Sequence, residues 1–107
     1  MGITYYFKMR VISVRKLKDF WEKKQHLGAE QPLRAWYAEA KAASWKNPNE
    51  IKQKYRSASM VGNNRVVFNI KGNTYRLIVA IRYEFKIVYI RFIGNHQEYD
   101  TIDAETI

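Results

Sequence analysis

The spacing of hydrophobic positions divides this chain into a helical first half and a β-rich second half. Between residues 13 and 55 apolar side chains recur at intervals of three and four, the period of an amphipathic helix. From Arg65 onward they alternate with polar side chains, the period of a strand with one buried face. We therefore expect helices over 13–55 and strands from residue 65 toward the C-terminus.

Start and stop signals divide the first half into three expected helices. Ser13 can cap the first helix, and Gly28 is a stop signal after it. Pro32 suits the first turn of the second helix, which must end before the next proline because the residue preceding a proline avoids helical backbone. Residues 47–50, Asn-Pro-Asn-Glu, resemble a cap, a first-turn proline and a capping-box glutamate, and so begin a short third helix. Residues 57–64 are turn formers and are expected to be a loop.

The second half predicts a hairpin followed by one more strand. RVVFNIK (65–71) and TYRLIVAIR (74–82) are separated by Gly72-Asn73, a typical two-residue turn. IVYIRFI (87–93) is the next strand, and MRVI (9–12) is expected to form a strand before the first helix. The order β-α-α-β-β-β indicates an α+β fold with the helices packed on one face of a small, mostly antiparallel sheet.

Strand alternation also predicts which side chains share a face. Those expected to meet the helices are Val66, Phe68, Ile70, Tyr75, Leu77, Val79, Ile81, Val88, Ile90 and Phe92. The opposite, uncovered face is then expected to carry Arg65, Asn69, Arg76, Tyr89 and Arg91. Arg91 is therefore expected on a basic, aromatic-studded surface although it interrupts a hydrophobic strand. Exposed strand positions often carry cations, so an ordinary solvated sheet face remains an alternative.

Length and composition restrict the class of protein. A chain of 107 residues suits one domain, which we place at residues 9–107, with residues 1–8 either an N-terminal extension or a stretch before a true start at Met9. The absence of cysteine excludes disulfides, thiolate zinc sites and cysteine nucleophiles. No apolar run reaches the roughly 18 residues of a membrane span, and the N-terminus lacks the apolar region of a signal peptide. A cytoplasmic protein that makes no membrane contact is expected.

The charge of the chain is unevenly distributed. The net charge is +9, but residues 1–95 hold all nineteen Lys and Arg against six acidic residues, a balance of +13, whereas residues 96–107 hold four acidic residues and no Lys or Arg. A small basic domain suggests a polyanionic partner, most often nucleic acid. Solubility alone is the other explanation of such a charge.

The strand that contains Arg91 leads directly to the most reactive side chains. His96 and Tyr99 follow within eight residues, and a helical turn there would place both on one side. His26 and His96 are 70 residues apart, so a metal site is not expected, and no phosphate-binding loop or nucleophile elbow is present. The histidine at position 26 suits a structural role at a helix end.

After these exclusions, the reaction that the side chains suit is cleavage of RNA without a metal or cofactor. The ribose 2′-OH can attack the adjacent phosphorus if cations stabilise the phosphorane and an acid and a base move the protons. Arg76 and Arg91 can bind the phosphate with planar forks. Histidine exchanges protons near neutral pH, which suits His96, and Tyr99 needs cationic neighbours to do so. Tyr89 can stack on a base.

At these residues the sequence resembles the HigB-type toxins of the RelE superfamily. The motifs that carry the resemblance are MRVIS (9–13), DFWEK (19–23), RVVFNIKGNTYRLIV (65–79) and VYIRFIGNHQEYDTID (88–103). The resemblance implies a RelE-like fold and an mRNA interferase, an endoribonuclease that cuts messages on the ribosome. It also implies inhibition by a helix-turn-helix antitoxin of the HigA type, with operator DNA bound only through the toxin–antitoxin complex.

The resemblance assigns expected roles to particular residues. Arg76 and Arg91 match arginines on the sheet of these toxins, and His96 and Tyr99 match the GTHAEYDK-like motif that follows. Asn95, Gln97 and Thr101 stand where that motif has Thr, Ala and Lys. Around these four expected catalytic residues, RNA binding is expected from Arg65, Asn69, Lys71 and Tyr89.

Two other functions are compatible with parts of the pattern. The same basic face can bind RNA or an acidic partner without cleavage, but binding does not require His96 and Tyr99 directly after Arg91. A purely structural subunit does not explain the +13 balance of residues 1–95.

Overall fold

Five strands form one sheet in the order β1-β5-β4-β3-β2 in the computed structural model, which describes residues 8–107. The elements are β1 (Arg10–Ile12), α1 (Arg15–Trp21), η2 (Lys24–Ala29), α2 (Glu30–Ala42), α3 (Pro48–Lys54), β2 (Ser59–Val61), β3 (Arg65–Ile70), β4 (Tyr75–Arg82), η3 (Tyr83–Phe85), β5 (Ile87–Asn95) and α4 (His96–Tyr99). Only β1 and β5 pair in parallel, and the other neighbours are antiparallel. The expected α+β class is confirmed. All but Lys8 of the expected N-terminal extension, residues 1–8, lies outside the described residues.

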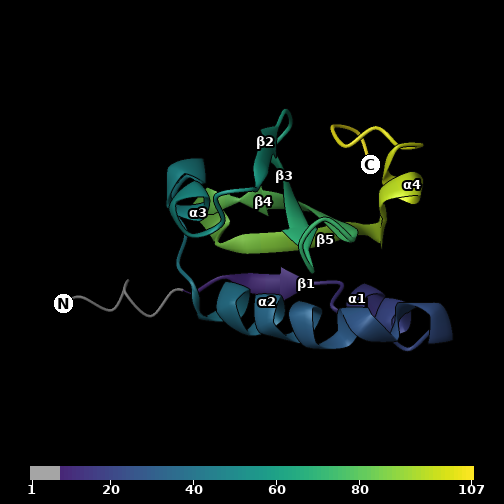
Figure 1. Cartoon of the computed structure of the whole chain (residues 1–107). Coiled ribbons are helices and arrows are strands. Elements are labelled where there is room, and N and C mark those ends of the chain that lie inside the picture. Colours follow the sequence, from purple (N-terminus) through teal and green to yellow (C-terminus); the bar gives the residue numbers. More distant parts are fainter. Residues whose placement is uncertain (1–7) are drawn as a thin grey trace.

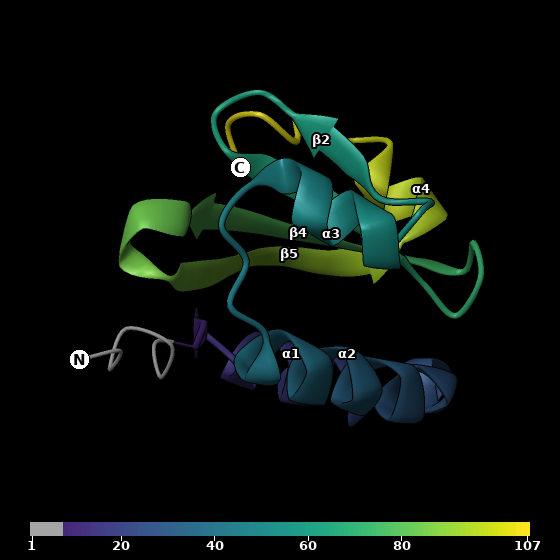
Figure 2. The ribbon, with the colours of Figure 1, turned by 90° about the vertical axis from the view of Figure 1, so that its left-hand side faces the viewer.

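The sheet separates two unequal layers. Helices α1 and α2 lie together on one side of it, whereas α4 and the segment that follows it lie on the other side (Figure 1). The view turned by 90° shows the same separation, with α3 beside the strands at the end of the sheet near β2 (Figure 2). The two helices therefore cover only one face, as the strand pattern predicts.

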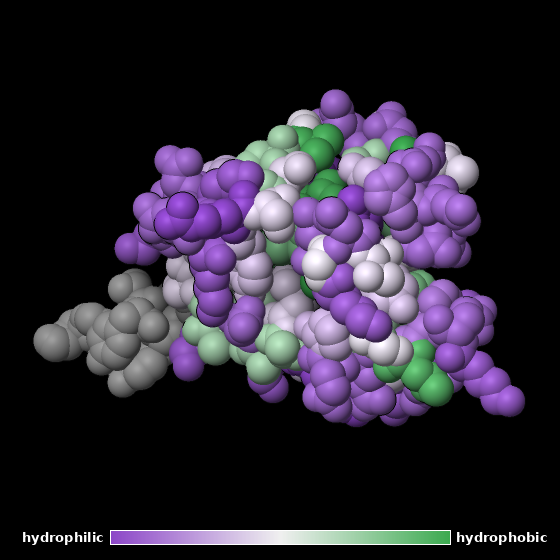
Figure 3. Space-filling model, viewed as in Figure 1, coloured by the Kyte–Doolittle hydropathy of each residue, from purple (hydrophilic) through white to green (hydrophobic). Residues whose placement is uncertain are grey.

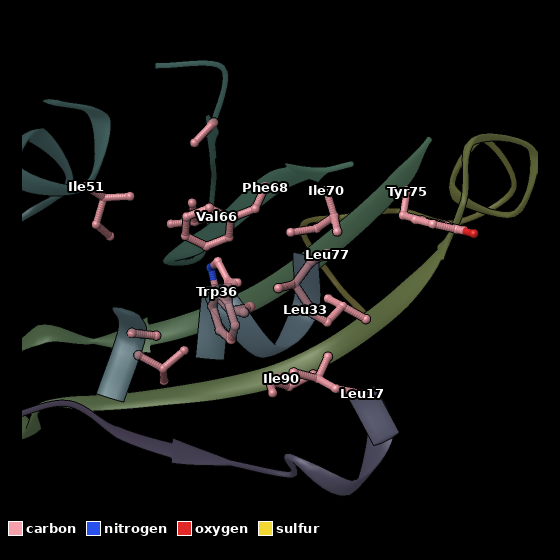
Figure 4. Packing of buried hydrophobic residues seen from close by; sticks show 14 of the residues in the cluster. Leu17, Leu33, Trp36, Ile51, Val66, Phe68, Ile70, Tyr75, Leu77 and Ile90 are labelled. Carbon is pink, nitrogen blue, oxygen red and sulfur yellow. The ribbon is translucent and has the colours of Figure 1, made fainter. Parts of the chain in front are cut away.

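The main core lies between the sheet and α1 and α2. Leu17 and Leu33 reach it from the helices, and both are fully buried against Leu77 and Ile90 of the central strands (Figure 4). Trp36 meets Phe68 edge to face, with ring centroids 5.4 Å apart. Interdigitated apolar side chains of this kind supply most of the driving force for folding. The expected inward positions of β3, β4 and the first half of β5 are confirmed.

The helix boundaries agree with the sequence signals in the middle of the chain. Asn47 caps α3 by accepting a hydrogen bond from the Glu50 amide at 3.1 Å, and Pro48 occupies the first turn. Pro32 lies in the first turn of α2. These signals are local, because a cap or a proline acts on groups within one turn of itself.

Two helix signals were wrong. Ser13 has a φ of 71° and does not cap α1, whose N-cap is Val14 without a side-chain hydrogen bond. Gly28 does not stop a helix, because it lies inside η2, which runs directly into α2. The chain instead leaves the helical conformation at Lys23, where ψ is 140°. Burial of α1 and α2 against the sheet determined these boundaries in place of the local preferences.

The expected loop over residues 57–64 contains a strand. β2 pairs antiparallel with β3, placing Ser59 opposite Val67 and Val61 opposite Arg65. Asn63 and Asn64 make the tight connection with φ values of 60° and 61°, a left-handed conformation that asparagine tolerates. A strand of three residues at a sheet edge is too short for its alternation to be recognised, and pairing with β3 creates it.

A β-bulge at Arg91 changes the expected faces of β5. Ile78 pairs with Phe92 and Val79 pairs with Ile90, so Arg91 is the extra residue. Beyond the bulge the alternation is reversed: Ile93, opposite Leu77, packs on the core, while Phe92 joins the face that carries Ile78. The prediction that Phe92 faces the helices was wrong, because one inserted residue exchanges the two sides of a strand.

The second face of the sheet is not bare. Val67 and Ile78 lie on this face, outside the main core, yet they are 3% and 0% exposed. The chain after α4 lies over this side (Figure 1), and its residues Ile102, Ala104 and Ile107 are partly buried. The C-terminal segment, residues 100–107, therefore covers the middle of a face that was expected to be open.

Candidate active site and nucleic-acid interface

Three rows of side chains cross the second face of the sheet. Strand register places Asn69, Arg76 and Gly94 in one row, beside α4. The middle row is Val67, Ile78 and Phe92. The far row is Arg65, Ala80 and Tyr89. An apolar row thus separates two polar rows, and Arg91 in the bulge stands next to the middle one.

Arg76 and Tyr99 are in contact. The Arg76 guanidinium carbon lies 5.8 Å from the centroid of the Tyr99 ring. Arg76 Nη1 donates to the Asn73 carbonyl oxygen at 2.9 Å, which ties the guanidinium to the β3–β4 turn. A guanidinium over an aromatic face is attracted by the ring quadrupole. This contact brings together two of the four expected catalytic residues, from β4 and from α4.

The short helix α4 is fixed at its start by a capping box. Asn95 Oδ1 accepts from the Glu98 amide at 2.8 Å, and Glu98 Oε1 accepts from the Asn95 amide at 2.8 Å. The reciprocal pair satisfies two amides that a helix start leaves unpaired. The predicted helical turn over His96 and Tyr99 is confirmed, and it begins directly at the end of β5.

His96 is held by a carboxylate. Its Nδ1 lies 3.2 Å from Asp100 Oδ2, one helical turn later, and both side chains are more than half exposed. An ionised carboxylate only accepts hydrogen bonds, so in the neutral form of the ring Nδ1 carries the hydrogen and Nε2 keeps a lone pair. A histidine oriented in this way by an acidic partner is the arrangement of a general base. Asp100 was not predicted to act, although its i, i+4 spacing from His96 is the signal that could have found it.

Arg65 and Arg91 converge on the C-terminal segment. Arg65 Nη2 donates to the main-chain oxygen of Ile107 at 2.7 Å, and Arg91 Nε donates to the same oxygen at 3.1 Å. Asn63 Nδ2 donates to the Glu105 carbonyl oxygen at 3.1 Å. Arg65 Nε is buried and has no hydrogen-bond partner among the described residues. The two arginines therefore already bind an oxygen acceptor, in the place where a phosphate oxygen would also be attracted.

The other expected RNA-binding residues lie further apart. Tyr89 is partly buried in the row of Arg65, while Asn69 Nδ2 donates weakly to the Ser57 carbonyl oxygen at 3.4 Å. The Lys71 side chain extends toward η2. Its Nζ lies so close to Gly28 that a Cβ atom added to this glycine would stand 2.5 Å from the nitrogen. Lys71 is thus placed near the helical layer. The structure does not bring it to Arg91.

His26 has the structural position that its sequence context indicates. It is 8% exposed, stacks on Phe20 with ring centroids 3.8 Å apart, and places Nδ1 3.3 Å from the Phe20 carbonyl oxygen. Among residues 8–107, no group of three His, Asp or Glu side chains is placed to hold a metal ion. None of the helices in the same stretch is long and apolar enough to cross a membrane.

One face of the molecule is largely polar. Hydrophilic residues cover most of the face visible in Figure 3, and the hydrophobic areas there are small and separate. The fold and these side chains define an α+β protein with Arg76, a histidine–aspartate pair and a tyrosine at one end of its sheet. Arg65 and Arg91 lie further along the same face, at the C-terminal segment.

The family of the chain follows from comparison with known proteins. The family of HigB toxins, the RelE-like toxic component of a toxin–antitoxin system, matches residues 29–102. This stretch is more than half of the chain, so the protein belongs to that family. It is the toxin of a toxin–antitoxin pair, and an antitoxin is its implied partner. A comparison with curated proteins gave no match.

Proposed function

We propose that this toxin is a ribosome-dependent endoribonuclease that cleaves mRNA in the cytoplasm. The observation that carries the proposal is the meeting of Arg76 with Tyr99 beside a histidine that Asp100 orients. A cation, a hydroxyl and an imidazole with an available lone pair are the groups that transesterification of RNA requires. Membership of a RelE-like toxin family supports the same activity.

The proposed reaction uses the 2′-OH of the message as its nucleophile. His96 Nε2 takes the 2′ proton while the 2′ oxygen forms a bond to phosphorus. The bond from phosphorus to the 5′ oxygen breaks, and Tyr99 donates the proton that this oxygen needs, which leaves a 2′,3′-cyclic phosphate and a 5′-OH. Arg76 and Arg91 stabilise the added charge on the phosphorane. No cofactor enters this sequence of steps.

The expression of the chain tests the proposal. Induction of the wild-type protein alone is expected to arrest growth and to produce cuts within translated reading frames. Mapping of 5′ ends by primer extension, with and without a start codon on the reporter message, shows whether cleavage depends on translation. A folded, well-expressed protein that neither arrests growth nor cuts RNA would contradict the proposal. The partner is proposed to be a helix-turn-helix antitoxin of the HigA type, through which the pair contacts operator DNA.

A further inference from the structure

We propose that the groove between α1 and the free edge of β5 binds a phosphodiester of the RNA strand next to the one that is cleaved. Lys16 and Lys23 would be its phosphate contacts. The inference rests on the proposed function, because it assigns a path for the strand beyond Arg91. Neither lysine is among the expected RNA-binding residues, and both precede the stretch 29–102 that matches the toxin family.

The groove exists because β1 is short. β1 pairs with β5 only as far as Ile12 opposite Tyr89. The chain then turns at Ser13, whose φ is 71°, and begins α1. The edge of β5 beyond Tyr89 therefore faces a helix instead of another strand. A groove of about 300 Å³ lies there, lined by Lys16, Asp19, Phe20, Lys23, Arg91, Phe92 and Ile93.

The charge of the groove suits a phosphate. It carries three cationic side chains and one carboxylate. The two acidic residues near α1 already have cationic neighbours at i, i−4: Asp19 lies 4.0 Å from Arg15, and Glu22 lies 4.0 Å from Lys18. Among the ion pairs formed within residues 8–107, none includes Lys16 or Lys23. The ammonium groups of Lys16 and Lys23 can therefore neutralise a phosphate without breaking an existing ion pair with a carboxylate.

Arg91 joins the groove to the candidate active site. It lines the groove and also donates to the Ile107 oxygen on the second face of the sheet. Phe92 also connects the groove with the candidate active site. Its ring lies against Gly94, where an added Cβ atom would stand only 2.5 Å from Phe92 Cζ. The ring thus extends from the groove toward the row of Arg76 and Gly94. An RNA strand with one phosphate at Arg76 and Arg91 can pass over Phe92, where a base can stack, and place its next phosphate between the lysines.

An acidic protein segment is the competing occupant. RNA is favoured because the groove shares Arg91 with the proposed catalytic set, so the strand that reaches the site is already at its entrance. A protein ligand would be detected by the same variants through loss of antitoxin affinity without any change in RNA binding. That result would overturn the proposal.

The test measures how RNA binding depends on salt. The probe is a short 2′-O-methyl RNA strand, which has no free 2′-OH and is not cleaved. For single strands each lost phosphate contact reduces the slope of log K against log salt by about 0.7. The double variant Lys16→Gln/Lys23→Gln is therefore expected to reduce the slope by about 1.4. The matched control Lys18→Gln/Lys41→Gln removes the same charge from the outer side of the helices, where Lys41 lies 5.1 Å from the Tyr37 ring, and is expected to change the slope by less than half as much.

Strand length gives a second readout. The probe is shortened at its 5′ end or at its 3′ end in separate measurements. Shortening at just one of the two ends is expected to weaken binding to the wild type and to remove the difference in binding between the wild type and the groove variant. Equal slope changes in groove variant and control, or no salt-dependent binding by the wild type, would overturn the proposal. Because the probe is not cleaved, a groove effect in a protein without nuclease activity would refute the proposed function alone. Normal cleavage with equal slopes would refute the groove alone.

Discussion

At the scale of single residues, the candidate site combines oriented arginines with side chains that are proposed to move protons. Arg76 is held by the Asn73 carbonyl oxygen and the Tyr99 ring, and Arg91 by the Ile107 oxygen, so both guanidinium groups are oriented before any ligand arrives. His96 and Asp100 form a pair on the exposed surface of α4. Preorganised cations are worth more in a transition state than mobile ones, because they need no rearrangement when charge develops.

Removal of either arginine is expected to abolish cleavage and to leave the fold intact. Arg91→Ala removes an exposed side chain, and Arg76→Ala removes a partly exposed one, so neither opens a cavity in the core. The control is Arg82→Ala, which removes the same charge from the far end of β4, where Arg82 pairs with Glu84 at 3.8 Å. Thermal melts and growth arrest are measured on all three variants. Unfolding of Arg76→Ala or Arg91→Ala would show that the arginine is structural.

Substitution of the two proton-transfer candidates is expected to slow cleavage without weakening RNA binding. His96→Gln keeps a hydrogen-bonding side chain, and Tyr99→Phe keeps the ring that lies beside Arg76. A general acid or base contributes roughly 10²- to 10⁴-fold, so losses of that size are expected in a single-turnover assay. Tyr37→Phe, on α2, is the control for loss of a hydroxyl. If rate and affinity instead fall together and modestly, these residues hold RNA and do not catalyse.

At the scale of elements, the C-terminal segment is expected to compete with the proposed RNA ligand for the basic face. It contributes the Ile107 oxygen to Arg65 and Arg91, and it carries acidic residues without any Lys or Arg. It also lies on the side of the sheet where Val67 and Ile78 are buried. The C-terminal segment thus completes the packing of this face. It also occupies hydrogen-bond donors of Arg65 and Arg91 that could otherwise bind a phosphate.

Deletion of residues 103–107 is expected to tighten binding of a non-cleavable RNA and to lower the melting temperature. Each released hydrogen bond is worth about 1 kcal/mol, or roughly fivefold in affinity, while exposure of Val67 and Ile78 destabilises the fold. Asp103→Asn/Glu105→Gln removes the two charges and keeps the main-chain contact to Arg65 and Arg91, so it isolates the effect of charge. An affinity unchanged by the deletion would show that these donors do not contact RNA.

The Tyr55 hydroxyl, at the end of α3, donates a hydrogen bond to the Glu39 carboxylate of α2. This contact is expected to make the stability of the fold depend on pH in the alkaline range. Burial, and then the hydrogen bond and charge of Glu39, raise the pKa of Tyr55 above its ordinary value. The folded chain therefore keeps this proton when the unfolded chain releases it near pH 10. This contribution is complete below pH about 10 and is lost as the pH rises further.

Urea midpoints of the wild type and Tyr55→Phe, measured from neutral pH upward, check this expectation. Tyr55→Phe is expected to be less stable at neutral pH, because it loses the bond to Glu39, but to show a shallower decline above pH about 10. Glu39→Gln keeps an acceptor without its charge and is expected to be intermediate. Parallel declines in all three proteins would contradict the assignment.

At the scale of the whole molecule, charge and layering act together. The net charge of +9 attracts polyanions over distances longer than any contact. The helices α1 and α2 lie on the side of the sheet opposite the candidate site (Figure 1). As a member of a toxin family, the chain is implied to have an antitoxin partner.

Co-expression of a helix-turn-helix protein encoded beside this chain is expected to abolish growth arrest. The two proteins are expected to co-purify, since toxins of such pairs are held inactive by binding. The measurement is growth with each protein alone and with both, followed by affinity capture of the toxin. Arrest that persists with a well-expressed neighbour that does not bind would contradict the HigA-type assignment.

Much of the fold and part of the site could be predicted from local patterns. Period and turn signals identified the helical and β-rich halves, the cap at Asn47 and the hairpin around Gly72. The helical turn that carries His96 and Tyr99 was also predictable, because Asn95 and Glu98 form its cap within four residues. These features depend on groups that are neighbours in sequence.

Other features could be decided only by tertiary structure. The bulge at Arg91, the edge strand β2 and the placement of Lys71 away from Arg91 depend on pairing and packing between distant segments. The same holds for the C-terminal segment, whose Ile107 meets Arg65 across 42 residues of sequence. By itself the sequence determined the class of fold, the charge and the types of reactive side chain, because periodicity and composition express local preferences. Which of those side chains meet was decided by the tertiary structure, because strand register and burial are properties of the whole sheet.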